Sequence, residues 1–139
     1  MAPMESRIVH LAINRDWRSV YNFAHRPENM SRWASGLGEG LRADGDGWLA
    51  DGGPLGEVRV NFAAPNALGV IDHVVDMPSG LRVHNAFRIV PNGDGAEAMF
   101  MVTRLPGQSP EQFEEDARHV EVDLQRLREI LETDVETSV

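Results

Sequence analysis

The stretch that decides the fold is the last long one, residues 109–133, which reads SPEQFEEDARHVEVDLQRLREILET. Its apolar residues recur at steps of four and three and form one stripe, made of Phe113, Ala117, Val120, Leu124, Leu127 and Leu131. Ser109 can cap a helix, Pro110 suits its first position, and Gln112 completes a capping box. We therefore predict one amphipathic helix about 36 Å long, whose apolar stripe must pack against the rest of the chain.

The composition limits both the partners and the chemistry. The 139 residues predict a single domain over 1–139, with 134–139 as a frayed tail. A net charge of -9 disfavours nucleic acid and anionic membrane surfaces as partners. The sequence contains no cysteine and no lysine, which excludes disulfides, thiolate nucleophiles and Schiff-base amines.

No segment has the character of a targeting or membrane element. Residues 1–7 lack the apolar core of a signal peptide, and no apolar run is long enough to span a bilayer. The expected location is the cytoplasm.

The first third of the chain predicts one strand and two short helices. Residues 6–14 alternate as a strand, and the side carrying Val9, Leu11 and Ile13 is the better core face. Asp16 opens a helix that is interrupted at 25–27. A second helix is expected over 27–34, where Met30 and Trp33 point the same way.

From residue 37 to 105, short apolar runs alternate with turns rich in Gly, Pro, Asn and Asp, which is typical of an antiparallel meander. The predicted strands are 38–43, 47–51, 55–63, 67–77, 81–90 and 96–105. Together with the first strand they predict an α+β fold, in which a curved antiparallel sheet of about seven strands packs on the final helix.

The register of one hairpin follows from its side chains. If 78–80 is the loop, one face pairs Met77 with Leu81, Val75 with Val83, His73 with Asn85 and Ile71 with Phe87. The other face pairs Asp76 with Arg82 and Val74 with His84. A slip of one residue would destroy both the apolar face and the opposite-charge pair.

The order of elements and several local phrases resemble the SRPBCC superfamily, the START-like helix-grip fold, in its polyketide cyclase/dehydrase-like branch. The phrases are Val20-Tyr21-Asn22-Phe23, Pro27-Glu28-Asn29 with Trp33, Asp72-His73, Arg88-Ile89-Val90-Pro91-Asn92 and the final helix. The resemblance implies a sheet wrapped round the last helix, with a hydrophobic ligand cavity between them. One departure is that Arg26 stands where such sequences often carry a capping acid.

His73 is the candidate catalytic residue, because it sits at an inward position among apolar neighbours and can exchange protons near neutral pH. Asn85 opposite could orient the imidazole or donate to a developing oxyanion. The alternative is a structural histidine whose hydrogen bonds are satisfied by Asn85 or by the backbone.

The residues expected to line the cavity come from nearly every element. They are Tyr21, Met30, Trp33, Trp48, Val58, Val60, Phe62, Ile71, Val75, Val83, Phe87, Phe100, Val102, Arg104, Phe113, Val120 and Leu124. Ordinary core packing is the alternative role for the aromatic ones. Arg104 either holds a ligand carboxylate or reaches solvent or an acid. The final helix is expected to give an aliphatic wall, with the acids near His119 on its exposed face.

Strand 96–105 is apolar on both faces, which raises the question of what covers its outer side. Met99 and Met101 would extend an outer patch with Val70, Val74, Ala86 and Val90. Our hypothesis is a homodimer packed through this outer face.

Metal and nucleotide cofactors are not expected. The sequence has no HxH or HExxH motif, no dinucleotide fingerprint and no GxSxG elbow. Three functions stay open: binding of a hydrophobic small molecule with cyclase- or dehydratase-type acid-base chemistry, a non-catalytic carrier or sensor with the same cavity, and a co-chaperone-like interaction module.

Overall fold

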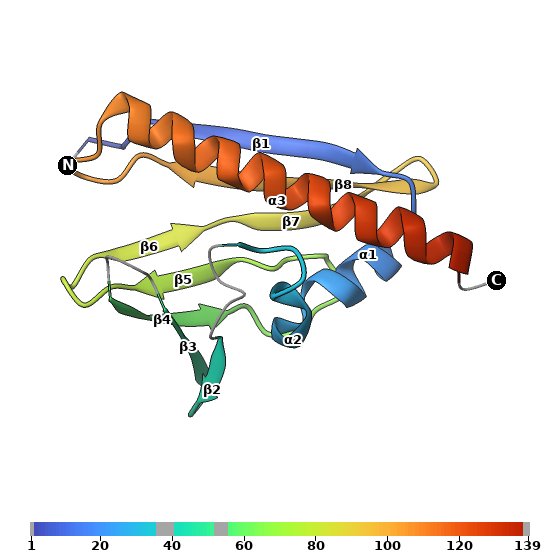
Figure 1. Ribbon diagram of the computed structural model, residues 1–139, viewed down its shortest axis with the longest axis horizontal. Coiled ribbons are helices and arrows are strands. Elements are labelled where there is room, and N and C mark those ends of the chain that lie inside the picture. Colours follow the sequence, from blue (N-terminus) through green and yellow to red (C-terminus); the bar gives the residue numbers. More distant parts are fainter. Residues whose placement is uncertain (1, 36–40, 52–55, 138–139) are drawn as a thin grey trace.

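The computed structural model describes residues 2–35, 41–51 and 56–137, with side chains as far as Thr133. Its elements are β1 (Ser6–Ile13), α1 (Trp17–Ala24), α2 (Pro27–Met30), β2 (Arg42–Asp44), β3 (Gly47–Asp51), β4 (Glu57–Phe62), β5 (His73–Asp76), β6 (Arg82–Asn85), β7 (Phe87–Asn92), β8 (Gly95–Thr103) and α3 (Pro110–Thr137). The fold is α+β, with antiparallel strands and a long last helix that crosses the molecule (Figure 1).

The strands form two antiparallel sheets, in the orders β1-β8-β7 and β2-β3-β4-β5-β6. The prediction of about seven strands in one sheet is therefore wrong. The predicted strand 81–90 is broken at Ala86, so that its first half, β6, pairs with β5 and its second half, β7, pairs with β8. The chain passes from one sheet to the other at this residue, whose carbonyl accepts a hydrogen bond from Met101 N at 2.9 Å.

The predicted strand 67–77 is also shorter than expected, because only its end forms β5. The preceding residues run beside β7 instead: Ile71 N donates to Phe87 O at 2.8 Å, and Ile89 N donates to Gly69 O at 2.9 Å. Val70 and Arg88 form a single bridge between these segments. The two sheets are thus joined where the chain at 69–72 crosses the start of β7.

The predicted hairpin register is confirmed. His73 pairs with Asn85, Val75 with Val83, Val74 with His84 and Asp76 with Arg82. On the outer face, Arg82 Nε donates to Asp76 Oδ1 at 2.7 Å.

Both short helices are present; α1 begins after Asp16 and ends before the predicted interruption at 25–27, whereas α2 ends earlier than predicted. Asp16 caps α1 by accepting a hydrogen bond from Ser19 N at 3.2 Å. The second helix, α2, ends at Met30, before the predicted residue 34, and Arg26 supplies no side-chain cap to it. Of the predicted strand 38–43, residues 38–40 lie outside the described residues and β2 begins at Arg42.

Helix α3 begins as predicted and continues to Thr137, beyond the predicted end. The capping box is reciprocal: Gln112 N donates to Ser109 Oγ at 3.1 Å, and Ser109 N donates to Gln112 Oε1 at 2.8 Å. Two donors that a helix start leaves free are satisfied in this way.

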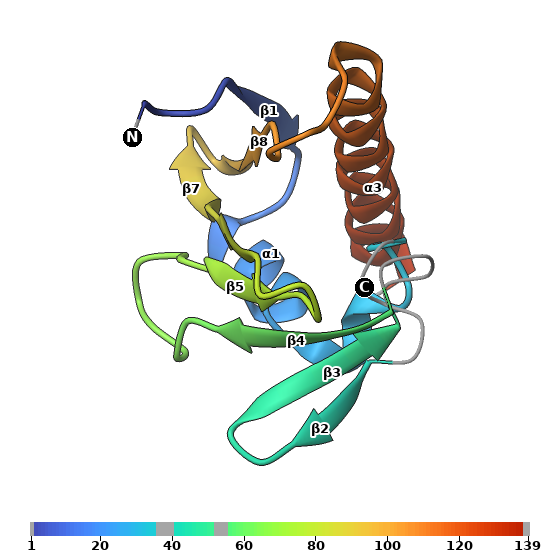
Figure 2. The same cartoon turned by 90° about the vertical axis from the view of Figure 1, so that its left-hand side faces the viewer.

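The core lies between α3 and the sheet β1-β8-β7. The stripe of α3 is buried at Phe113, Ala117, Leu124, Leu127 and Leu131. It packs on β1 and β8, and Figure 2 shows α3 standing against that side of the molecule. Burying one such leucine contributes about 1.5–3 kcal/mol. As predicted, β1 turns Val9 and Ile13 inward, while Ile8 on its other face is 54% exposed.

Across the described ranges, the helices lack any stretch that combines the length and apolarity needed to cross a bilayer.

Candidate functional site

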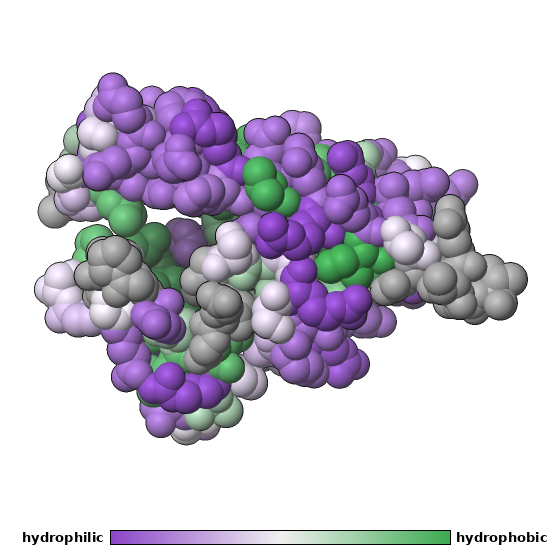
Figure 3. Space-filling model, viewed as in Figure 1, coloured by the Kyte–Doolittle hydropathy of each residue, from purple (hydrophilic) through white to green (hydrophobic). Residues whose placement is uncertain are grey.

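A cavity of about 340 Å³ lies between the N-terminal half of α3 and the strands β5 to β8. Figure 3 shows its mouth as a hollow between α3 and β6, with apolar residues inside. The lining residues are Met30, Trp33, Ala34, Ser35, Phe62, His73, Val75, Met77, Val83, Asn85, Phe87, Phe100, Val102, Thr103, Leu105, Asp116, His119, Val120, Asp123 and Leu124. The volume falls in the range of about 300–1,000 Å³ that small-molecule sites occupy.

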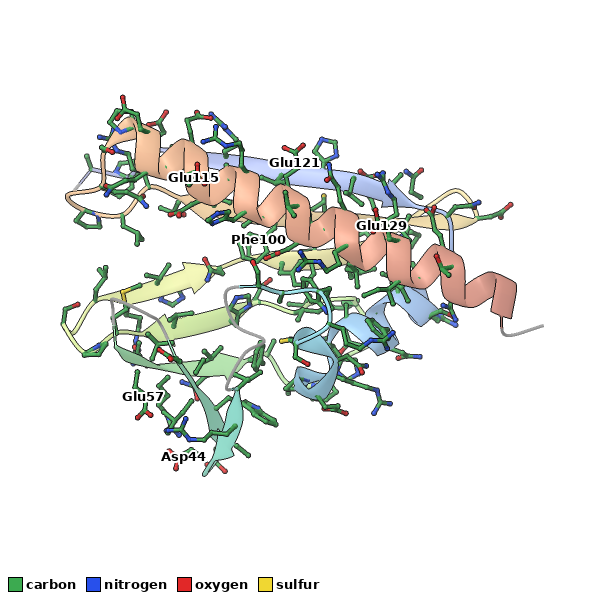
Figure 4. All side chains as sticks on the ribbon, in the orientation of Figure 1. Asp44, Glu57, Phe100, Glu115, Glu121 and Glu129 are labelled. Atoms are coloured by element: carbon green, nitrogen blue, oxygen red, sulfur yellow. The ribbon has the colours of Figure 1, made fainter. Side chains whose placement is uncertain are left out.

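His73 lies among aromatic rings in the wall of the cavity. Its ring centroid is 5.4 Å from that of Phe62 and 5.8 Å from that of Phe100. Phe100 in turn packs against Phe87 at 5.6 Å, and Figure 4 shows Phe100 lying beneath α3. Only 5% of His73 is exposed.

The hydrogen bonding of His73 fixes the role of each ring nitrogen. Nδ1 lies 3.1 Å from Ile71 O, and because a carbonyl can only accept, Nδ1 must carry a proton and donate. Burial lowers the pKa of His73, against the opposing effects of the Ile71 carbonyl and the Asp72 charge, so the neutral ring is favoured. In the neutral ring Nε2 is then an acceptor, and no hydrogen-bond partner is described for it.

Asn85 faces His73 across the hairpin and lines the same cavity. The described hydrogen bond of the imidazole is to the Ile71 carbonyl and not to the Asn85 amide. Both side chains are therefore placed at the cavity wall, each able to meet a bound molecule.

Most of the predicted lining residues lie together in the cavity wall. Those that do are Met30, Trp33, Phe62, Val75, Val83, Phe87, Phe100, Val102, Val120 and Leu124, besides His73 and Asn85. Trp48, Val58 and Val60 pack instead in a second apolar cluster under β3 and β4. Ile71 and Phe113 belong to the main core.

Tyr21 and Arg104 also lie outside the lining. The Tyr21 hydroxyl accepts a hydrogen bond from Asn66 N at 3.0 Å, and its ring stacks on His25. Arg104 Nε donates to Gln108 O at 2.9 Å, and its Nη1 lies 3.7 Å from the Glu5 carboxylate. The Arg104 guanidinium is thus occupied at the start of α3.

The polar lining residues of α3 were missed by sequence reasoning. Asp116, His119 and Asp123 all border the cavity, so this wall of α3 is not aliphatic as expected. Asp116, Val120 and Asp123 follow helical spacing and lie on one edge of the apolar stripe, which is a signal the sequence does contain.

Asp123 is a largely buried acid on this edge. Its side chain is 14% exposed, and it accepts a hydrogen bond from Ser35 Oγ at 2.9 Å. Burial raises the pKa of Asp123, while the Ser35 hydrogen bonds and the Arg126 charge oppose the rise. Asp116 accepts a hydrogen bond from Gln108 Nε2.

Within the described ranges, no three His, Cys, Asp or Glu side chains lie close enough together to hold a metal ion.

No protein-family model matches this chain, and no curated protein matches it. Solved structures do resemble it. DynU16, a protein in the dynemicin biosynthetic locus, matches at a TM-score of 0.71 and 13% identity, over 95% of this chain and 49% of DynU16. The chain therefore spans about half the length of DynU16.

Two further structures show the same arrangement. CalU16 from Micromonospora echinospora matches at a TM-score of 0.66 and 12% identity, over 91% of this chain and 73% of its own. MLL2253 from Mesorhizobium loti matches at a TM-score of 0.71 and 14% identity, over 93% of this chain and 98% of MLL2253. At such low identities, the similarity establishes a shared fold alone.

Proposed function

We propose that this protein has the helix-grip fold of the SRPBCC superfamily and binds an apolar small molecule in the cavity beneath α3. The observation that carries the proposal is the cavity itself, about 340 Å³ in volume and walled by Phe62, Phe87 and Phe100. Its wall also holds His73, whose Nε2 has no partner among the described residues. The resemblance to DynU16, from a biosynthetic locus, supports a small-molecule role.

A matched pair of substitutions tests the binding proposal. Val83 lines the cavity, whereas Val74 lies on the opposite face of the same hairpin. We expect Val83→Phe to weaken binding of naphthylmethanol, measured by calorimetry, by at least about tenfold, because the new ring occupies the ligand space. Val74→Phe serves as the control and should leave the affinity unchanged. Equal affinities in both variants would contradict the proposal and favour the interaction module.

Acid-base catalysis is a second candidate function, and the accessible acceptor of His73 is the observation that favours it. A neutral imidazole with Nδ1 protonated can take a proton at Nε2 from a bound C–H or O–H acid and return it. Such a base would serve cyclase- or dehydratase-type chemistry on a bound carbonyl compound. The non-catalytic carrier or sensor would use the same cavity without proton transfer.

Proton exchange separates the enzyme from the carrier. β-Tetralone is a two-ring ketone with acidic C–H bonds, and its exchange in deuterated buffer can be followed by NMR. If His73 is a base, His73→Gln should slow protein-catalysed exchange by about a hundredfold or more while ligand affinity is kept. Exchange that never exceeds the buffer rate, together with normal binding, would favour the carrier.

A further inference from the structure

Two acidic side chains, Asp116 and Asp123, line the cavity, and none of its described lining residues is an arginine. We infer that the cavity selects ligands whose polar group is an uncharged or positively charged hydrogen-bond donor, such as an alcohol, a phenol or an amine, and rejects ligands with a carboxylate. This inference rests on the proposed binding function and defines its ligand class.

The cavity lining carries two acids and, besides His73, one histidine, His119, whose Nε2 lies 3.3 Å from the Glu115 carboxylate. Asp116 and Asp123 line it from α3, and none of the described lining residues is an arginine. The residues outside the described ranges, 1, 36–40, 52–55 and 138–139, contain no lysine or arginine in their sequence. No undescribed side chain can therefore bring a guanidinium or ammonium group to the site.

The arginines near the mouth are already paired with protein groups. Arg104 is bound to Gln108 O and lies close to Glu5, and Arg118 pairs with Glu115 at 2.5 Å. Arg126 Nη1 lies 3.9 Å from Asp123 and points to the carbonyl of Trp33. An entering carboxylate would have to break such a pair to find a cationic partner.

Besides the Trp33 Nε1–H donor, which is buried without a described hydrogen-bond partner, the cavity wall offers an acceptor. Because Nδ1 of His73 donates to Ile71 O, the free Nε2 presents a lone pair to the ligand space. A hydroxyl or an ammonium can donate a hydrogen bond to this nitrogen. An ionised carboxylate has no proton to donate, so its oxygen and Nε2 would repel each other. Asn85 can donate or accept, and so it discriminates less.

Four probes with one naphthalene body test the inference: methylnaphthalene, naphthylmethanol, naphthylmethylamine and naphthoate. They are titrated by calorimetry at about pH 7.5, where the amine is protonated and the acid ionised. We expect the alcohol and the amine to bind at least about tenfold more tightly than naphthoate, because like charges in a partly buried site repel strongly.

Charge-removing variants locate the source of the selection. We expect Asp123→Asn to reduce the preference for the amine over naphthoate by about tenfold, and Asp116→Asn to act in the same direction. Glu129→Gln is the control: it removes one charge from an exposed position of α3 outside the cavity (Figure 4), so the net charge of the protein changes equally.

The possible outcomes distinguish a failure of the charge inference from a failure of the proposed small-molecule binding. If naphthoate binds as tightly as the alcohol, or if both aspartate variants keep the wild-type preference, the charge inference is wrong and small-molecule binding stands. If none of the four probes binds, methylnaphthalene included, then the binding function itself is wrong and the inference falls with it.

Discussion

At the scale of single residues, His73 links the cavity to the pH dependence of stability. Burial lowers its pKa from the ordinary 6.5, so below that pH the unfolded chain binds a proton that the folded protein resists. Above about pH 6.5 the ring is neutral in both the folded and the unfolded state, and burying it carries no protonation cost. As the pH falls below 6.5, the free energy of unfolding decreases because only the unfolded chain binds the proton readily.

The first prediction concerns the slope of that loss. As the pH falls below about 6.5, we expect His73 to lower the free energy of unfolding by up to about 1.4 kcal/mol per pH unit. His25, whose pKa is lowered by partial burial and by Arg26, adds a smaller slope of the same sign. Urea unfolding at several pH values should show a flatter profile for His73→Gln. An unchanged slope would mean that His73 takes up its proton equally well in the folded protein.

Asp72, next to His73, has a structural role in holding two segments together. It accepts a hydrogen bond from Phe87 N at 2.9 Å, and two from Arg88, at 2.9 and 2.8 Å. These bonds to Arg88, and then the one to Phe87 N, lower the pKa of Asp72 against the effect of burial. Asp72 thereby joins the segment before β5 to the start of β7.

The second prediction separates the two bonds of Asp72. Asp72→Ala leaves the partly buried Phe87 N–H without its acceptor and should cost about 1–3 kcal/mol. Arg88→Ala removes only an ion pair whose side chains are 46% and 35% exposed, which contributes about 0–1 kcal/mol. Thermal unfolding of the two variants measures the difference, and equal losses would assign the stability to the ion pair.

At the scale of elements, the junction of the two sheets depends on Gly69. Its φ is +75°, and a Cβ there would lie 1.9 Å from the carbonyl oxygen of Ile89 on β7. Gly80, in the turn before β6, has a similar φ of +92° and nothing within 4 Å of the same position. The two glycines therefore differ in their surroundings and not in backbone region.

The third prediction compares alanine substitutions at Gly80 and Gly69. Gly80→Ala should cost about 1–2 kcal/mol, the strain of a left-handed L-residue. Gly69→Ala adds a clash with backbone and should cost more than about 3 kcal/mol, seen as a lower midpoint in chemical unfolding. Similar midpoints for both variants would show that β7 can move away from Gly69 freely.

Helix α3 supplies the fourth prediction, because two of its apolar residues differ in burial. Both line the cavity, but Leu124 is fully buried in the core, whereas Val120 is only partly buried. Val120→Phe should fill part of the cavity and weaken naphthylmethanol binding with little loss of stability. Leu124→Phe overpacks the core and should destabilise by about 1–3 kcal/mol. If Val120→Phe is the more destabilising change, Val120 is a plain core residue.

Local patterns predicted α3 and the hairpin well, and long-range geometry explains what they missed. The capping residues of α3 and the pairing of His73 with Asn85 depend on neighbours close in sequence. The break at Ala86 depends on β8, which is distant in sequence and hydrogen-bonds to the chain there. The residues next to Ala86 give no local signal of the break. The acids near His119 are expected on the exposed face of the helix, yet Asp116 and Asp123 lie at the edge of the apolar stripe, and the wall opposite that edge is fixed only by the tertiary fold.

At the scale of the whole molecule, the division into two sheets accounts for the cavity. Helix α3 packs closely on β1 and β8 of one sheet, while the other sheet continues from the junction at Ala86 beneath it (Figure 2). The second sheet thus faces α3 across a space that side chains fill only in part. A single flat sheet packed along α3 would leave no such volume.

The fifth prediction concerns the outer face of β1-β8-β7, opposite α3. Ile8 pairs with Met101 there and is 54% exposed. Beside them, His10 Nδ1 lies 2.8 Å from Glu97, so the apolar surface is bordered by polar contacts. We propose that two copies of the chain pack through this face, burying Ile8 and the methionines from water.

Light scattering at micromolar concentration should then give the mass of two chains, and Ile8→Arg should give that of one, because a charge would be buried without a partner. Leu68→Arg is the control, since Leu68 is 76% exposed and lies outside that sheet. A wild-type mass of one chain would rule out this dimer. A dimer that persists in Ile8→Arg would place the interface on another face, and the cavity mouth would then become the surface to test.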